Sequence, residues 1–114
     1  MNLYWNEKHT EFAVLISPGY GAGWSTWNHD AMAYDKRVVE WFLSAAAKNT
    51  TANEREKLFN EWGYDDVYFG GLDHLMLKWV PANAIWRVSE YDGSEEIEYF
   101  DEREWNCFPN SEVK

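Results

Sequence analysis

The dipeptide Asp92-Gly93 constrains the fold of this chain more than any other feature of its sequence. It separates two runs of alternating apolar and polar residues, 84–91 and 94–100. A two-residue turn of type I′ needs a positive φ at both central residues, and Asp followed by Gly meets that need. We therefore predict a β-hairpin whose strands pair in one register. The predicted pairs are Val88 with Ile97, Trp86 with Tyr99, Arg87 with Glu98, Ile85 with Phe100, and Glu90 with Glu95.

Residues 11–17 (EFAVLIS) form the most apolar run in the chain. Apolar side chains occupy both faces of this run, which is typical of a strand that is covered on both sides. We expect it to be the central strand of the sheet. One face would carry Phe12, Val14 and Ile16, and the other would carry Ala13 and Leu15.

Two helices are predicted further along the chain. The first spans residues 35–48, where apolar side chains recur at helical spacing. Asp35 supplies its N-cap, or Asp30 does if the helix begins earlier. The second helix begins at the capping box 51–54 (TANE), in which a hydroxyl and a carboxylate satisfy unpaired backbone amides. It should end just before Gly63, which suits the left-handed stop of a helix.

The remaining predicted elements are strands. We expect a short strand at residues 67–69 and a longer one at 75–80, which Pro81 ends. Residues 1–10 are too short and mixed to decide whether they form an edge strand. Together with the hairpin, these elements predict a single α+β domain over residues 1–114. Its antiparallel sheet would have about four to five strands, with two helices packed on one face.

A glycine-rich loop, residues 17–28 (SPGYGAGWSTWN), connects the predicted central strand to the first helix. Glycines permit positive φ angles and close backbone contacts. The aromatics Tyr20, Trp24 and Trp27 are either folded back over the core or held out as a contact surface, and the sequence leaves both open. The order of strand, glycine loop and helix resembles a phosphate-binding turn, but the loop lacks the P-loop lysine and hydroxyl and the G-x-G-x-x-G spacing. Because the likeness is only partial, binding of a nucleotide or another small molecule by this loop is our alternative hypothesis and not the leading one.

The net charge of −10 is unevenly distributed. Residues 1–57 contain six Lys/Arg and seven Asp/Glu, whereas residues 58–114 contain four and thirteen. Because proteins bind DNA and RNA largely through cations that displace phosphate counterions, we expect no direct nucleic-acid binding. The single cysteine, Cys107, leaves no internal disulfide, and the sequence shows neither a basic, apolar leader nor an apolar run of about 18 residues. We expect a soluble, cytoplasmic protein that does not bind membranes.

No motif for catalysis or metal binding stands out. His9, His29 and His74 have acidic neighbours, but they lack a ligand spacing such as H-x-x-x-H. Ser17 and Ser25 lack the G-x-S-x-G context of an activated serine nucleophile. We therefore expect no enzyme activity, no metal site and no cofactor.

Residues 90–104 form an acidic segment with eight Asp/Glu, one Arg and interleaved apolar side chains. Such a segment is either a solvated outer face of the hairpin or a recognition surface for a basic partner. We expect the opposed Glu90 and Glu95 to be exposed near the turn, with a small mutual repulsion. The acidic residues predicted to bind a partner are Glu90, Asp92, Glu95, Glu96, Glu98, Asp101 and Glu102, and the loop residues predicted to bind a partner or ligand are Tyr20, Trp24 and Trp27.

Three stretches of the chain, VLISPGYGAGWSTWN, DKRVVEWF and VYFGGLDHLMLKWVPANAIWRVSEYDGSEEIEYFDE, resemble small acidic proteins encoded by bacteriophages. The resemblance spans residues 12–102 and includes no motif of known chemistry. It implies a bacterial cytoplasm during infection, where small acidic phage proteins often bind host defence machinery. The resemblance carries no functional residues to this chain.

The leading hypothesis is a non-enzymatic phage protein that binds and inhibits a basic, nucleic-acid-handling host protein, in the manner of anti-CRISPR and other anti-defence inhibitors. It depends on the negative charge, the small size and the absence of catalytic motifs. The alternatives are ligand binding by the glycine loop and a role as a virion accessory protein. A second copy of the chain, forming a homodimer, is the other partner that we consider.

Overall fold

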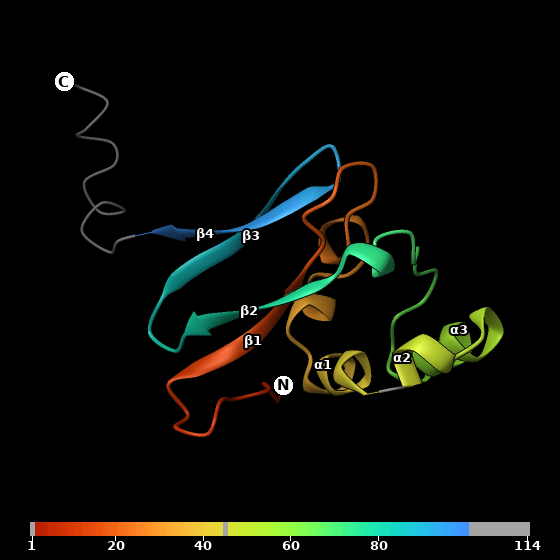
Figure 1. Ribbon diagram of the computed structural model, residues 1–114, viewed down its shortest axis with the longest axis horizontal. Coiled ribbons are helices and arrows are strands. Elements are labelled where there is room, and N and C mark those ends of the chain that lie inside the picture. Colours follow the sequence, from red (N-terminus) through yellow and green to blue (C-terminus); the bar gives the residue numbers. More distant parts are fainter. Residues whose placement is uncertain (1, 45, 101–114) are drawn as a thin grey trace.

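Strand β1 (Glu11–Ile16) lies between two layers of the molecule, as its two apolar faces require. The computed structural model describes residues 2–44 and 46–100. Figure 1 shows β1 and β2 (Met76–Pro81) in the middle, with β3 (Ile85–Tyr91) and β4 (Ser94–Phe100) above them and the helices below. The fold is therefore α+β, as predicted. The helices are α1 (Lys36–Leu43), α2 (Ala46–Asn49) and α3 (Ala52–Glu61), and the 3-10 helices are η1 (Ser25–Trp27), η2 (Asp30–Ala33) and η3 (Leu72–His74).

The described strands form two separate two-stranded antiparallel sheets, β1 with β2 and β3 with β4. The prediction of one sheet with about four to five strands was wrong in this respect. The β3–β4 hairpin folds over β1 because helices on one side cover only one of the two apolar faces of this strand. Phe12, Val14 and Ile16 of β1 pack against Trp86, Val88 and Ile97 of the hairpin, whereas Ala13 and Leu15 pack against the helical side.

The register of the hairpin is the predicted one at every pair. Val88 lies opposite Ile97, Arg87 opposite Glu98, and the other three predicted pairs are present as well. Asp92 has a φ of 51° and Gly93 a φ of 87°, as a type I′ turn requires. The turn chemistry of two residues therefore sets the pairing of both strands.

The first helix is shorter than predicted. Asp35 is its N-cap, since its carboxylate accepts a hydrogen bond from the backbone amide of Arg37 at 2.9 Å. The helix ends at Leu43 because Ser44 takes an extended conformation, with φ −85° and ψ 164°. The Ser44 hydroxyl donates to the Trp41 carbonyl at 2.7 Å and so satisfies a carbonyl at the helix end. The predicted helix 35–48 is therefore divided into α1 and α2.

The second helix has both predicted ends. The Thr51 hydroxyl accepts from the Glu54 amide, and the Glu54 carboxylate accepts from the Thr51 amide, which completes the capping box. Gly63, just beyond the helix, has a φ of 93°.

The strand predicted at 67–69 does not form. The Asn28 side chain accepts from the backbone amide of Tyr68 and donates to its carbonyl, so a side chain takes the place of a neighbouring strand.

Phe59 of α3 is the centre of an aromatic core on the helical side of β1. It is fully buried, and its ring meets the Trp41 ring edge-on at a centroid distance of 5.1 Å. Trp24 from the glycine loop is also fully buried against Phe59, and its indole nitrogen donates to the Met32 carbonyl at 3.1 Å. One of the three loop aromatics is therefore a core residue and not a contact residue.

Candidate functional site

Glu95 holds the glycine loop from inside. This residue is only 1% exposed, and one carboxylate oxygen accepts a hydrogen bond from the Ser17 amide at 2.8 Å. The other oxygen accepts from the amides of Trp24 at 2.8 Å and Thr26 at 3.0 Å, and from the Thr26 hydroxyl. The loop thus wraps its backbone donors around an anion, in the way that backbone nests bind phosphates and other anions.

The prediction that Glu95 is exposed was therefore wrong. The predicted register already contained the signal, because it put Glu95 on the same face as Ile97 and Val88, which face the core. The likeness of the loop to a phosphate-binding turn has a related explanation. Its converging amides do bind an anion, but that anion is a carboxylate of the same chain, so these donors are already used.

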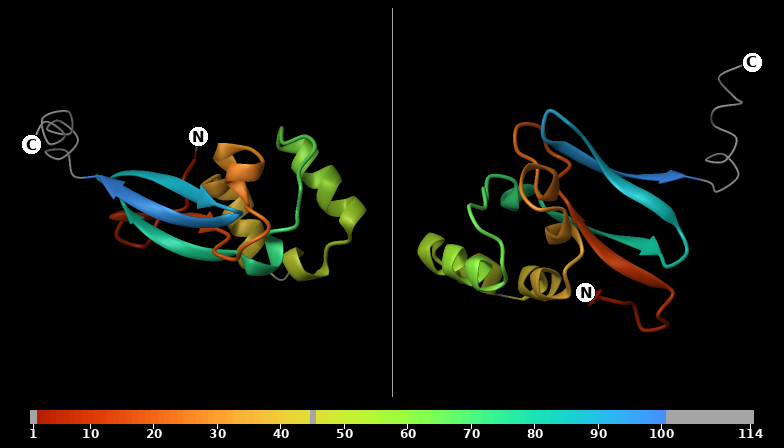
Figure 2. Two further views of the ribbon diagram at one scale, coloured as in Figure 1. Left: turned by 90° about the horizontal axis from the view of Figure 1, so that it is seen from above. Right: turned by 180° about the vertical axis from the view of Figure 1, so that it is seen from behind.

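The hairpin turn packs directly on the glycine loop. The Gly21 amide donates to the Asp92 carbonyl at 2.7 Å, and the Ser94 hydroxyl donates to the Pro18 carbonyl at 2.7 Å. Gly93 has no room for a side chain, because a Cβ atom there would collide with the Ala22 backbone nitrogen. Figures 1 and 2 show the orange loop beside the blue end of the hairpin from opposite sides. The two segments that the sequence offered as alternative sites are thus one unit.

Trp27 connects this unit to a third segment. Its ring stacks on Tyr68, with centroids 6.0 Å apart and planes at 25°. Its indole nitrogen donates to the Glu90 carboxylate at 3.1 Å. Glu90 also accepts from the Gly93 amide at 2.8 Å, and this hydrogen bond, followed by that of Trp27, lowers the pKa of Glu90. Glu90 is therefore held as an ionised, exposed carboxylate beside an exposed indole.

Aromatic side chains are the most exposed large residues around the turn. Tyr91 is 78% exposed and Tyr20 is 72% exposed, and they are sequence neighbours of the hydrogen-bonded Asp92 and Gly21. Trp27 and Tyr68 are also partly exposed, at 42% and 53%. We call this region the loop–turn surface. It consists of Tyr20, Trp27, Tyr68, Glu90, Tyr91 and Asp92.

The structure separates the predicted acidic residues into groups. Glu90 and Asp92 belong to the loop–turn surface. Glu96 is exposed and Glu98 is partly exposed, and the register puts both on the hairpin face opposite to Glu95. Glu98 forms an ion pair with Arg87 at 2.6 Å. The remaining two predicted residues, Asp101 and Glu102, lie outside the described residues.

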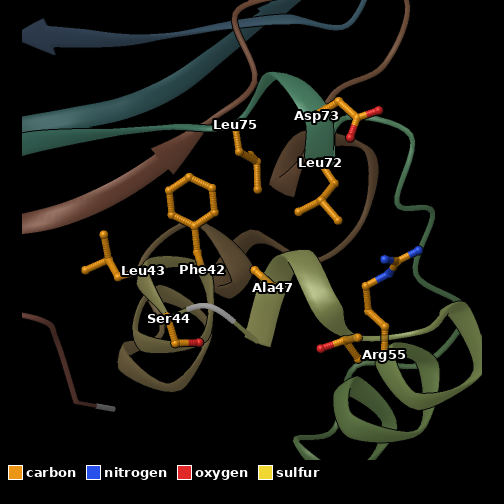
Figure 3. Close-up of a pocket in the computed structure, with 9 residues that line it drawn as sticks. Phe42, Leu43, Ser44, Ala47, Arg55, Leu72, Asp73 and Leu75 are labelled. Atoms are coloured by element: carbon orange, nitrogen blue, oxygen red, sulfur yellow. The ribbon is translucent and has the colours of Figure 1, made fainter.

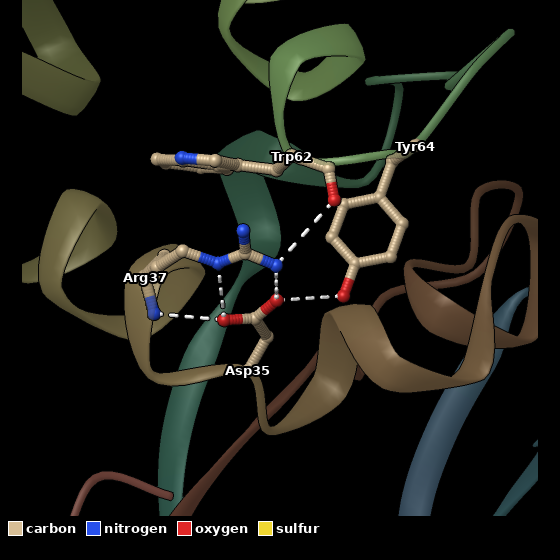
Figure 4. Close-up of polar contacts among 4 residues, drawn as sticks. All are labelled: Asp35, Arg37, Trp62 and Tyr64. Atoms are coloured by element: carbon tan, nitrogen blue, oxygen red, sulfur yellow. Dashed lines mark hydrogen bonds and ion pairs between the residues drawn. The ribbon is translucent and has the colours of Figure 1, made fainter. Parts of the chain in front are cut away.

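A second buried carboxylate, that of Asp35, is the centre of a polar cluster with the buried Tyr64 and the half-exposed Arg37 (Figure 4). The Arg37 guanidinium donates to both of its oxygens, at 2.7 and 3.1 Å, and the Tyr64 hydroxyl donates at 2.7 Å. Burial raises the pKa of Asp35, but the hydrogen bonds from Arg37 and Tyr64 outweigh it, so the pKa is lowered overall. Burial and then the contact with Asp35 raise the pKa of Tyr64 to about 12. Both oxygens of Asp35 serve the helix cap and the connection to the end of α3, so we assign this cluster to the fold.

Within residues 2–44 and 46–100, no helix is long and apolar enough to cross a membrane. The same residues contain no group of three or more His, Cys, Asp or Glu that is placed to hold a metal ion.

No protein-family model, curated protein or solved structure matches this chain.

Proposed function

We propose that this chain is a non-enzymatic binding protein whose loop–turn surface docks on the basic surface of a nucleic-acid-handling protein and inhibits it. The observation that carries the proposal is the junction of the glycine loop and the hairpin turn. Through it, Tyr20, Trp27, Tyr68 and Tyr91 are exposed beside the carboxylates of Glu90 and Asp92.

The charge of this region favours a basic partner. The three segments that build the loop–turn surface, residues 17–28, 64–71 and 90–96, contain no Lys or Arg. A groove of about 450 Å³ beside the surface is lined by the carboxylates of Asp30 and Glu90 and by Arg87, whose charge is paired with Glu98. Negative potential of this kind accelerates the approach of a positively charged surface and excludes nucleic acid itself.

The aromatic side chains supply the contact energy that charges alone do not. Tyr and Trp are enriched among the residues that dominate binding energy at protein interfaces. Trp27 is held by its stacking on Tyr68 and its hydrogen bond to Glu90, so less side-chain entropy is lost when a partner binds. A fixed aromatic group within an acidic surface therefore suits protein recognition.

Inhibition follows from the class of partner. A protein that handles nucleic acid binds phosphates with clustered Lys and Arg. An acidic protein that covers these cations competes with the nucleic acid for them. The resemblance of the sequence to small acidic phage proteins suggests that the target is a defence protein of an infected bacterium.

A pull-down with matched variants tests the proposal. Immobilised wild-type protein should retain nucleic-acid-binding proteins from bacterial lysate at low salt, and added DNA should release them. Retention should fall as the NaCl concentration rises from about 0.05 to about 0.5 M, because the Debye length shortens. Tyr91→Ala and Asp92→Asn should each reduce retention. Asn tolerates the positive φ of position 92, so the second change removes a charge without straining the turn.

The controls make similar changes away from the turn. Tyr99→Ala removes another exposed tyrosine, near the end of β4 that lies away from the turn, and Glu40→Gln removes an exposed charge from α1. Both controls should retain the partner as the wild type does. The proposal is wrong if these controls lose the partner as much as the two test variants do, or if no nucleic-acid-binding protein is retained.

A further inference from the structure

A cavity of about 780 Å³ lies between the helices and η3, on residues that the loop–turn surface does not use. Figure 3 shows Phe42 pointing from α1 toward Leu75, and Leu72 pointing from η3 toward α2. The volume is within the range of small-molecule sites, which are lined mostly by apolar side chains with a few polar groups. The apolar lining consists of Phe42, Leu43, Ala47, Leu72 and Leu75.

Arg55, from the first turn of α3, supplies a positive charge to this lining. Its guanidinium lies over the Phe69 ring, 4.6 Å from the centroid, which restricts its orientation. Its Nε atom is buried and finds no hydrogen-bond acceptor among the described residues. Trp41 Nε1 is the other such buried side-chain atom in the described chain. Arg55 as a whole is half-buried and its guanidinium forms no hydrogen bond with another described residue, so its terminal nitrogens remain able to donate to an acceptor oxygen of a ligand.

Asp73 contributes a negative charge to the same lining. Figure 3 shows it on the same side of the cavity as Arg55. The two side chains do not form an ion pair with each other, since the ion pairs of the described residues are those of Arg37 and Arg87. The lining therefore offers two opposite charges next to an apolar space. One arginine beside an acidic residue suits a single carboxylate better than a doubly charged phosphate.

We propose that this cavity binds a small apolar carboxylate that also carries an amine, such as an α-amino acid with an aromatic or branched side chain. The ligand's carboxylate binds the guanidinium of Arg55. Its ammonium group faces Asp73, and its apolar body packs on Phe42 and Leu72. The fixed guanidinium reduces the entropy lost when the carboxylate binds.

Three matched probes test this assignment on the full chain by isothermal titration calorimetry: L-phenylalanine, 3-phenylpropanoate, which lacks the amine, and phenethylamine, which lacks the carboxylate. L-phenylalanine should bind best and phenethylamine worst. Arg55→Gln should weaken L-phenylalanine binding about 10- to 100-fold, as expected for the loss of hydrogen bonds to a charged group. Asp73→Asn should reduce the preference for L-phenylalanine over 3-phenylpropanoate.

Lys57→Gln is the matched control, because it removes a positive charge from an exposed position of the same helix. It should leave all three affinities unchanged. Ala47→Leu is a second test that keeps Arg55, and it should weaken binding by filling part of the cavity. Circular dichroism checks that each variant is folded.

Three results would overturn the proposal. The first is the absence of saturable binding of L-phenylalanine at concentrations up to about 10 mM, which corresponds to a negligible affinity. The second is equal binding by wild type and a folded Arg55→Gln variant. The third is tighter binding of phenethylamine than of 3-phenylpropanoate. None of these results affects the loop–turn surface, which is tested with different residues.

Discussion

Trp24 donates its backbone amide to the carboxylate of Glu95 at 2.8 Å, although 71 residues separate the two in sequence. The contact joins the glycine loop, which follows β1, to the start of β4, where Glu95 is the second residue. It satisfies the backbone amide of a fully buried tryptophan with a carboxylate oxygen of a fully buried glutamate. The same carboxylate accepts hydrogen bonds from Ser17 and Thr26, so one side chain fixes the conformation of the glycine loop.

Replacing Glu95 with Gln should lower the free energy of unfolding by about 2 kcal/mol or more. The Gln amide has nearly the same shape, but its NH₂ group must face a backbone N–H that now lacks an acceptor. Urea denaturation measures the change. Glu96→Gln, one residue away and exposed, should change the free energy of unfolding by no more than about 0.5 kcal/mol. Equal effects of the two substitutions would contradict the role of Glu95.

Gly93→Ala should destabilise the protein more than Gly63→Ala. Both glycines have a positive φ, of 87° and 93°, so the backbone strain of an added Cβ is similar. At Gly63 the Cβ would find no atom within 4 Å, whereas at Gly93 it would collide with the backbone of the glycine loop. The difference in the free energy of unfolding should be about 1–3 kcal/mol, the usual cost of overpacking.

Chemical denaturation of the two alanine variants, side by side, measures that difference. Equal costs would mean that the turn and the loop separate readily, and that the loop–turn surface is not a fixed unit.

Stability should fall at high pH because of Tyr64. The folded chain holds the Tyr64 proton up to a pKa of about 12, whereas the unfolded chain releases it near the ordinary value of 10.0. The unfolded state therefore binds fewer protons between these values, and the free energy of unfolding decreases as the pH rises through this window. The contribution of Tyr64 is fully present below pH 10.0.

Tyr64→Phe tests this origin of the pH dependence. The variant should be less stable at neutral pH, because Asp35 loses one donor. It should also show a smaller decrease in stability between pH 10 and 12 than the wild type does. Urea titrations at stepped pH measure both effects, and an unchanged alkaline slope would contradict the assignment.

The ends of several helices could be predicted because the sequence signals for them come from neighbouring residues. The capping box at Thr51 and Glu54, the cap at Asp35 and the stop at Gly63 all form as predicted. Each depends on residues within a few positions of one another. Ser44 shows the limit of such signals. The apolar spacing continues past it, but the chain turns to an extended conformation there and divides the predicted helix.

The candidate site was only partly predictable for a similar reason. The sequence identified Trp27, Glu90 and Asp92, because aromatic and acidic side chains next to turns are conspicuous. It did not indicate Tyr68, which reaches the loop–turn surface through the contacts of Asn28 and Trp27. The sequence analysis also grouped Trp24 with the exposed Tyr20 and Trp27, although Trp24 is fully buried in the core.

The sequence by itself therefore determined the α+β class, the register of the hairpin, the start of α1 and both ends of α3, since these follow from local backbone preferences and side-chain alternation. Only the tertiary structure decided that the hairpin covers β1 instead of extending its sheet, and that Glu95 lies inside the glycine loop. Alternation shows which side chains share a face, but it does not show which distant segment will cover that face. A buried carboxylate is stable only where remote amides converge on it, and the sequence does not specify that convergence locally.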